Sequence, residues 1–171
     1  MDKFWKNSLW QQYGAAIDTL DDALRLCPDR LWETVLWEEE EDARYGQFWY
    51  IAYHTLFWTD LFLGAADVSY EQFTPPAPFI RGKFPDEPYP KDDIHSYLKQ
   101  CRDKCKATIE ALTDENARQI CIFPWMEPSY LELQLYSLRH IQEHAAQLNM
   151  ILGHRGITGQ DWVANARDEL L

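Results

Sequence analysis

The chain has 171 residues, of which 46% are hydrophobic and 15% aromatic, so it is long and apolar enough to fold around a buried core. Its formal net charge of −12 would repel phosphate groups, which disfavours binding to nucleic acid or to an anionic membrane surface. We find neither a secretory signal nor an apolar run of about 20 residues that could span a bilayer. These properties predict a cytoplasmic protein with a single domain over residues 1–171.

Two helices are predicted in the first third of the chain. From Trp10 to Leu24, apolar residues recur at gaps of three and four, which predicts a helix over about 8–26 with Ser8 as its N-cap. A short turn is expected within 29–37, and the acidic run 38–42 is expected to be a solvated loop. The second helix is predicted over about 46–63, with Gly64 at its end.

A long proline-rich connection follows, and then a third helix. Residues 65–91 contain six prolines and several aromatic residues, which favours an irregular segment packed over the helices. Asp92 or Asp93 is the expected cap of a helix that reaches about residue 112. Within this helix, Cys101 and Cys105 continue an apolar repeat of three and four residues, so we interpret them as reduced core residues.

The last predicted helix follows a second connection over residues 113–127. Pro128 or Ser129 is expected to open this helix and Gly153 to end it, and Trp162 in the tail 157–171 is expected to cover an edge of the bundle. Four amphipathic helices without a comparable strand pattern predict an all-α fold, a four-helix bundle with long connections and a short C-terminal tail.

Three histidines of the predicted bundle form a possible metal site. His140 and His144 are four residues apart, so their imidazoles lie on one helix face and can share one ion. A catalytic zinc-type site usually takes three protein ligands, and His54 in the second helix is the candidate for the third. The alternative is that these are hydrogen-bonded core histidines. His95 is expected at a surface or rim position, and His154 is expected to be exposed.

The neighbours of these histidines can be placed by helical geometry. Tyr136, Glu143 and Gln147 lie on roughly the His140 face, where Gln147 could orient a ligand and Glu143 could act as a base, although a solvated helix edge is the simpler interpretation of Glu143. The His54 face carries residues that we interpret mainly as core rather than as a substrate platform. They are Gln47, Tyr50, Phe57, Trp58 and Leu61.

Two known patterns match the last helix. The residues His140-Ile-Gln-Glu-His144 fit the H-x-x-E-H pattern of inverted zinc peptidases, but that family has a larger chain and takes its third ligand well downstream. The second pattern covers nearly the whole chain. One His in the second helix, then His140-x-x-x-His144-x-x-Gln147-Leu148, and then Gly153, resembles the DinB-like (DinB/YfiT) superfamily. Ala145-Ala146 before Gln147 departs from relatives that have Gly there.

The resemblance implies a four-helix bundle, frequently a homodimer, that binds zinc or nickel through residues matching His54, His140 and His144. It also implies a metal-dependent transferase that uses a low-molecular-weight thiol on a small electrophilic substrate, with a metal-dependent hydrolase as the alternative. A three-His metal can lower the pKa of a thiol or of bound water, so both reactions are chemically coherent.

A function of a different class stays open. The chain could be a non-catalytic bundle that uses a metal for stability, or a binding module whose aromatic surface pairs with itself or with a partner. Phe4, Trp5, Trp32 and Trp37 are the aromatic residues that such a surface could use.

Overall fold

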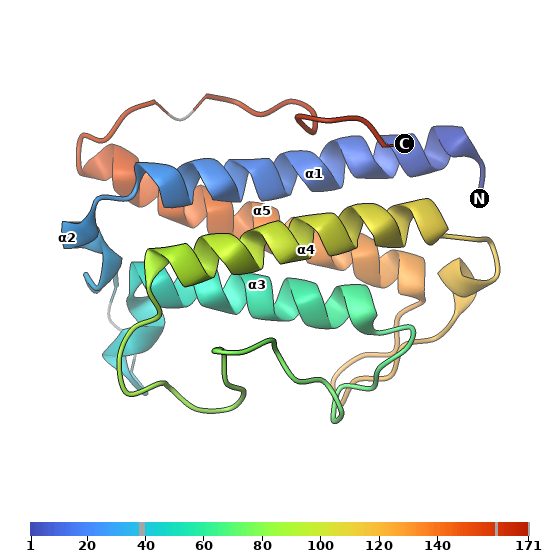
Figure 1. Ribbon diagram of the computed structural model, residues 1–171, viewed down its shortest axis with the longest axis horizontal. Coiled ribbons are helices and arrows are strands. Elements are labelled where there is room, and N and C mark those ends of the chain that lie inside the picture. The colour runs from blue at the N-terminus through green and yellow to red at the C-terminus, as the bar shows by residue number, and fades with distance from the viewer. Residues whose placement is uncertain (38–39, 160, 171) are drawn as a thin grey trace.

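The computed structural model describes residues 1–37, 40–159 and 161–170, which form helices and loops with a few isolated β-bridges. Four long helices lie side by side along the long axis, which confirms the predicted bundle (Figure 1). They are α1 (Lys3–Leu26), α3 (Phe48–Gly64), α4 (Lys91–Ala111) and α5 (Tyr130–His154). The shorter elements are α2 (Asp29–Trp32), η1 (Ala43–Gly46) and η2 (Asn116–Arg118).

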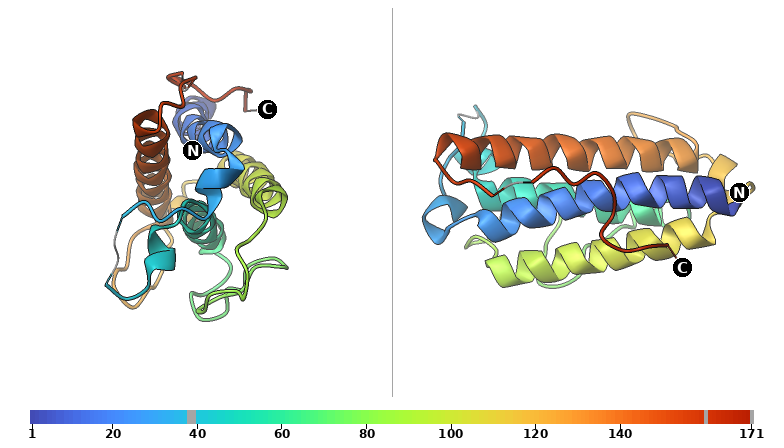
Figure 2. Two further views of the ribbon diagram at one scale, coloured as in Figure 1. Left: turned by 90° about the vertical axis from the view of Figure 1, so that its left-hand side faces the viewer. Right: turned by 90° about the horizontal axis from the view of Figure 1, so that it is seen from above.

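The four long helices form a ring in which α1 and α3 are diagonal. Each of these two packs against both α4 and α5, as the end-on view shows (Figure 2). Helices α3 and α4 run in the same direction, because Leu56 contacts Cys101 and Asp60 contacts Lys104. A parallel pair requires a connection that returns along the whole helix, and residues 65–90 provide it (Figure 1).

The core lies between the four helices, and the predicted apolar seam of α1 is buried in it. Cys101 and Cys105 on α4 are buried free thiols, as the sequence predicts, and Cys27 and Cys121 are also free. Burial raises the pKa of Cys27 to about 12 and those of Cys101 and Cys105 well above the ordinary thiol value. None of the described helices is long and apolar enough to cross a membrane.

The proline-rich connection is packed over the outer side of α3, as predicted. Phe73, Phe79 and Tyr89 are buried in the core. The hydroxyl of Tyr53 on α3 donates to the carbonyl of Ile80 at 2.5 Å, and the N–H of Ile80 donates to the hydroxyl of Tyr89 at 2.9 Å. Because α3 is covered by the bundle on one side and by this segment on the other, it can be apolar nearly all round.

Two predicted N-caps are wrong. Helix α1 begins at residue 3, because the side chain of Asp2 accepts a backbone N–H of the first turn, so Ser8 is an interior residue and no cap. Helix α4 begins one residue after Pro90, which is its N-cap without a side-chain hydrogen bond. Asp92 and Asp93 lie in the first turn instead, where their negative charges favour the helix dipole.

Helix α5 starts as predicted but ends later. The hydroxyl of Ser129 caps it by accepting the N–H of Glu132 at 3.3 Å. Gly153 lies within the helix, and the chain leaves the helical path at Gly156, whose φ of +72° lies in the left-handed region that favours glycine. His154 is exposed in the last turn, as expected.

The acidic run is described only in part. Residues 38 and 39 lie outside the described residues, while Glu40 and Glu41 are exposed, which agrees with a solvated loop. Asp42 caps η1 by accepting the N–H of Arg44.

The C-terminal tail runs along α1 (Figures 1 and 2). Trp162 does not cover an edge of the bundle, because its side chain is 85% exposed. The tail can approach closely because Gly14 has no side chain: a Cβ there would lie 2.6 Å from the Cβ of Ala166. The indole of Trp10 donates to the carbonyl of Asp168 at 2.8 Å. The prediction for Trp162 is therefore wrong, since other tail residues make these contacts.

Candidate metal centre

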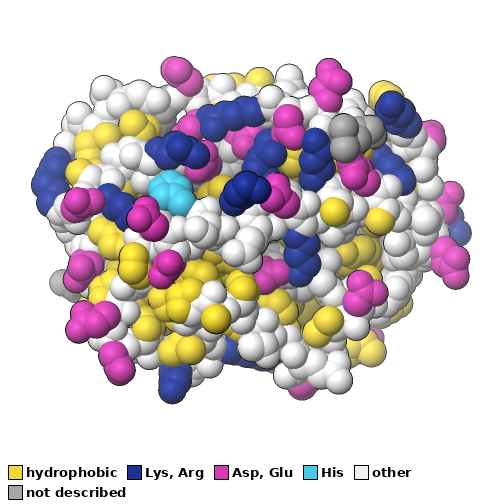
Figure 3. Space-filling view, viewed as in Figure 1, with side chains coloured by type: hydrophobic (Ala, Val, Ile, Leu, Met, Phe, Trp, Pro, Cys, Tyr) yellow, Lys and Arg dark blue, Asp and Glu magenta, His cyan; other side chains and the backbone are white. Residues whose placement is uncertain are grey.

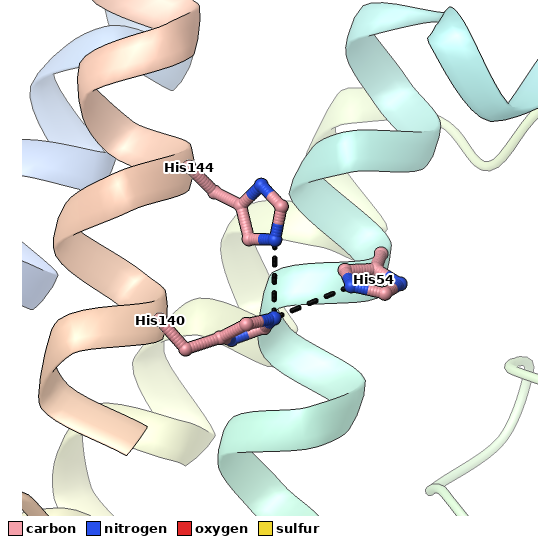
Figure 4. Close-up of side chains that lie close together, drawn as sticks. All are labelled: His54, His140 and His144. Carbon is pink, nitrogen blue, oxygen red and sulfur yellow. Dashed lines mark hydrogen bonds between the residues drawn. The ribbon is translucent and has the colours of Figure 1, made fainter. Parts of the chain in front are cut away.

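Helix α3 places His54 between the bundle and the proline-rich segment. The neighbouring Ile51 and Thr55 are buried in the core, while His54 is half-buried and points toward α5 (Figure 4). The imidazole is therefore at the border of the core.

Two side chains of α5 fix its alignment with α3. The last carbonyls of a helix have no partner within the helix. Here the hydroxyl of Tyr130 donates to the carbonyl of Leu63 at 2.6 Å, and the amide of Gln134 donates to the carbonyl of Phe62 at 3.1 Å. These bonds hold the two antiparallel helices in the alignment that brings His140 and His144 opposite His54.

The three imidazoles converge through their Nε2 atoms, as Figure 4 shows. The Nε2 of His140 lies 3.3 Å from that of His54 and 3.1 Å from that of His144. All three donor atoms lie within 4.8 Å of one another. Metal–nitrogen bonds of about 2.0–2.1 Å at tetrahedral angles place two ligand nitrogens about 3.3 Å apart. The residues therefore fit a zinc-type ion, and the predicted grouping of the three histidines is confirmed.

The electrostatics of the site favour the neutral form of His54 and His140. Burial, followed by the charge of His144, lowers the pKa of His54 to about 4. Burial, followed by the charges of His144 and His54, lowers the pKa of His140 to about 3. Both side chains are unprotonated at pH 7, which is the form that binds a metal.

Gln147 contacts a ring nitrogen of the cluster. Its side-chain oxygen lies 2.7 Å from the Nδ1 of His144. An amide oxygen only accepts hydrogen bonds, so the proton of His144 is placed on Nδ1 and the lone pair on Nε2, which faces the other imidazoles. The buried Nδ1 of His140, by contrast, has no hydrogen-bond partner among the described residues.

The other residues predicted around the histidines divide into two groups. Tyr136 and Glu143 line the cavity at the three imidazoles, and Glu143 is exposed there. Gln47 lies elsewhere, because its amide donates to the carbonyl of Glu33 and accepts from the indole of Trp49. Leu61 is only 2% exposed and belongs to the core.

Two cavities meet at His54 and Trp58. The first, of about 340 Å³, contains the three histidines and is walled by Phe62, Trp125 and Tyr136. The second, of about 320 Å³, lies between α3 and the proline-rich segment. Tyr50, Phe57 and Trp58 pack against the core and also line the second cavity, so the interpretation of Tyr50 and Trp58 as core residues holds only in part.

Sequence reasoning missed the residues that loops bring to these cavities. Trp125 comes from the second connection, and its ring lies 5.6 Å from that of Trp58. Arg81 and Lys83 come from the proline-rich connection and line the second cavity. The sequence signal that could have found them is the Arg-Gly-Lys triplet 81–83, a basic island in an acidic chain.

The two remaining histidines do not join the cluster. His95 is a rim residue on α4, 3.6 Å from Asp21, as expected.

The third member of the cluster, His54, precedes His140 and His144 in the chain. The inverted zinc peptidases take their third ligand downstream, so the arrangement departs from that pattern.

Comparison with known protein families matches most of the chain. The family model described as the DinB superfamily matches residues 12–148, a range that contains the three histidines and Gln147. No curated protein matches the chain, and no solved structure does either.

Proposed function

The chain belongs to the DinB superfamily, and on that premise we propose that it binds one divalent metal ion, zinc or nickel, through His54, His140 and His144. The observation that carries the proposal is the convergence of three Nε2 atoms from two helices, with separations that suit one ion. Lowered pKa values at His54 and His140 support it, because no proton has to leave either side chain before a metal binds at pH 7.

The reaction that we propose is a transfer of a low-molecular-weight thiol to a small electrophile. When bound, the metal would act as a Lewis acid and lower the pKa of the thiol. Gln147 holds the proton of His144 on Nδ1, and the aromatic side chains of Trp58 and Trp125 line the cavity beside the imidazoles. Glu143, at the open side of the same cavity, is the carboxylate that can accept a proton.

Hydrolysis by a metal-activated water is the alternative reaction of the same site. The exposed Glu143 favours it, because a carboxylate beside the metal can take a proton from water. The two reactions differ in their need for thiol. Hydrolysis proceeds without it and is lost in Glu143→Gln, whereas transfer requires it.

The first experiment measures metal content by mass spectrometry in protein purified without a histidine tag. We expect about one ion per chain in the parent and in His154→Ala, a control at the exposed end of α5. We expect the ion to be lost in His54→Ala, His140→Ala and His144→Ala. Protein that holds no metal even after exposure to zinc and nickel would contradict the proposal. The result would instead favour the non-catalytic binding module.

The second experiment tests the thiol. The visible spectrum of the cobalt-substituted protein is recorded during titration with cysteine and with glutathione. A new sulfur-to-cobalt charge-transfer band supports the transferase. If neither thiol changes the spectrum, the transferase is contradicted, and the hydrolase is then screened with thiol absent.

A homodimer and a cytoplasmic location complete the proposal, and both rest on the family resemblance and the sequence. Sedimentation equilibrium of the untagged protein would give about twice the chain mass of 20.3 kDa for a dimer. Phe4 and Trp5, which are 69% and 62% exposed, are the aromatic residues available for such a contact, whereas Trp32 is buried.

A further inference from the structure

The second cavity differs in charge from the rest of the molecule. The chain carries 28 acidic against 16 basic residues, and Figure 3 shows both signs mixed over the face that carries α1 and α4. The described lining of the 320 Å³ cavity nevertheless contains Arg81 and Lys83 and no carboxylate. A pocket with two cations in an acidic protein attracts an anion.

Arg81 is already ordered for such a role. Its Nη1 donates to the carbonyls of Tyr70 and Phe73 at 2.5 and 3.0 Å, and its guanidinium carbon lies 4.3 Å from the centre of the Tyr70 ring. Its Nε and Nη2 make no hydrogen bond within the described part of the chain. A guanidinium held in this way binds a planar anion without a large loss of side-chain entropy.

Gly82 makes the turn that separates the two cations. Its φ of +75° lies in the left-handed region, and a Cβ there would meet nothing within 4 Å. The conformation of the backbone, rather than crowding, therefore calls for glycine. The turn keeps both Arg81 and the exposed Lys83 at the cavity.

The remaining walls of the cavity are aromatic and lead to the metal centre. Tyr50, Phe57 and Phe84 line it, and His54 and Trp58 line both this cavity and the one that holds the three imidazoles. The ring of His54 lies 6.1 Å from that of Tyr50. A flat apolar molecule with its negatively charged group at Arg81 would extend along these rings toward His54.

We propose that this cavity binds the substrate of the metal centre and that the substrate is a small aromatic carboxylate. The carboxylate lies at Arg81 and Lys83, and the ring lies on the aromatic wall beside His54. The role of this molecule as a substrate rests on the metal-dependent function proposed above. A volume of about 320 Å³ is at the lower end for ligand sites, which suits one or two fused rings.

The test is isothermal titration calorimetry with 2-naphthoate and with 2-naphthamide, a neutral molecule of nearly the same shape. Each is titrated into metal-free and zinc-loaded protein. We expect naphthoate to bind both forms and naphthamide to bind at least about tenfold more weakly, because an ionised hydrogen-bond acceptor gains more from a guanidinium. Equal affinities for the two compounds would overturn the proposal.

Matched variants locate the anion. Lys83→Glu should weaken naphthoate binding by about tenfold or more and leave naphthamide binding unchanged, since only a charge is reversed. Arg81→Lys should weaken naphthoate binding by a few-fold, because the planar guanidinium is lost while the positive charge stays. Lys99→Glu on the exposed side of α4 is the control and should change neither affinity. Unchanged naphthoate binding in Lys83→Glu would contradict the assignment.

The same titrations separate this inference from the proposed function. If naphthoate binds only zinc-loaded protein and Lys83→Glu has no effect, the carboxylate contacts the metal and the cavity assignment is wrong, while the metal site stands. If naphthoate binding depends on Lys83 but the protein takes up no metal, the anion site stands, and its link to a metal reaction is overturned together with the proposed function.

Discussion

The two ring nitrogens of His144 have different partners, and this difference defines the candidate metal centre at the scale of single residues. Nε2 faces His140, while Nδ1 faces the side-chain oxygen of Gln147. A ligand histidine whose second nitrogen is hydrogen-bonded keeps its tautomer and its orientation. We therefore expect Gln147 to act as a positioning residue through His144.

Replacement of Gln147 by alanine should lower metal affinity. Loss of an outer-shell partner of a ligand typically costs about 10–100-fold in affinity. Competition with a zinc chelator measures this change. Gln147→Glu keeps an acceptor oxygen and should restore much of the affinity, whereas the exposed Gln100→Ala on α4 should have no effect. Equal affinities of parent and Gln147→Ala would rule out the positioning role.

Protonation of the buried histidines should make the metal-free protein less stable in mild acid. The folded-state pKa values of His54 and His140 are lowered to about 4 and about 3, so below about pH 6.5 the unfolded chain binds these protons first. Stability is therefore lost as the pH falls from about 6.5 toward these values. Between pH 6.5 and 5.5 the loss should be about 1 kcal/mol for each histidine.

Urea unfolding of metal-free protein at the two pH values measures this loss. His140→Leu should show about half of the parent's pH dependence, and His154→Ala should keep nearly all of it, because His154 is exposed. A parent whose unfolding free energy does not change between pH 6.5 and 5.5 would contradict the lowered pKa values.

The three histidines could be predicted from the sequence, because helical periodicity alone places His140 and His144 on one face and His54 is the single histidine of the second apolar helix. The triplet 81–83 marks Arg81 as a basic residue in an acidic chain, but the sequence does not show where its guanidinium lies. Its position depends on three carbonyls of residues 70–73 and on the turn at Gly82. No periodic pattern encodes such loop contacts.

At the scale of elements, the pairing of α3 with α5 depends on the carbonyls at the end of α3. Tyr130 and Gln134 occupy these carbonyls from the first turns of α5. The sequence predicts both helices from their apolar residues, but it gives no sign of this cross-helix bonding. The same limit explains why the start of α1 is predicted at the wrong residue. The apolar periodicity begins at Trp10, whereas the residue that caps α1 is Asp2.

Tyr130→Phe should destabilise the protein by about 1–2 kcal/mol. The change removes one hydroxyl from a side chain that is 4% exposed and leaves the carbonyl of Leu63 without its partner. Urea unfolding measures the loss. Tyr136→Phe on the same helix is the control, because Tyr136 is 37% exposed, and it should change stability by less than about 0.5 kcal/mol.

The tail and α4 are both attached to α1 through Asp18. This carboxylate, only 3% exposed, accepts from the Nε of Arg102 at 2.8 Å and from the backbone N–H of Arg167 at 2.9 Å. Asp18→Ala should therefore lower the free energy of unfolding by about 2–3 kcal/mol. The exposed pair Lys99–Asp103 provides the contrast, since Asp103→Ala should cost less than about 0.5 kcal/mol. Equal effects of the two variants would contradict this account.

At the scale of the whole molecule, the core that holds the bundle together does not depend on the three histidines of the candidate metal centre. The core is continuous through all four long helices, and the three histidines lie at its border, where they are half-buried. The long proline-rich connection permits α4 to run parallel to α3, but the direction itself is seen only in the contacts between the two helices. The order of the helices around the ring depends on packing that no single segment reveals.

Removal of the metal should therefore change the melting temperature by only a few degrees if the site is catalytic. An ion that binds only the folded state raises stability in proportion to the logarithm of its concentration over its Kd. Calorimetric melting of zinc-loaded and chelator-treated protein, compared in parent and His140→Ala, measures the difference. A drop of many degrees, or loss of the helical circular dichroism signal on chelation, would instead support a structural metal.

The separation of the ligands along the chain has a consequence for biosynthesis. His54 and His140 are 86 positions apart, and they meet only when α5 has packed against α3. A nascent chain on the ribosome exposes His54 as a solitary imidazole long before the second and third are made. The complete set of possible ligands therefore exists only after α5 has been made and has packed against α3.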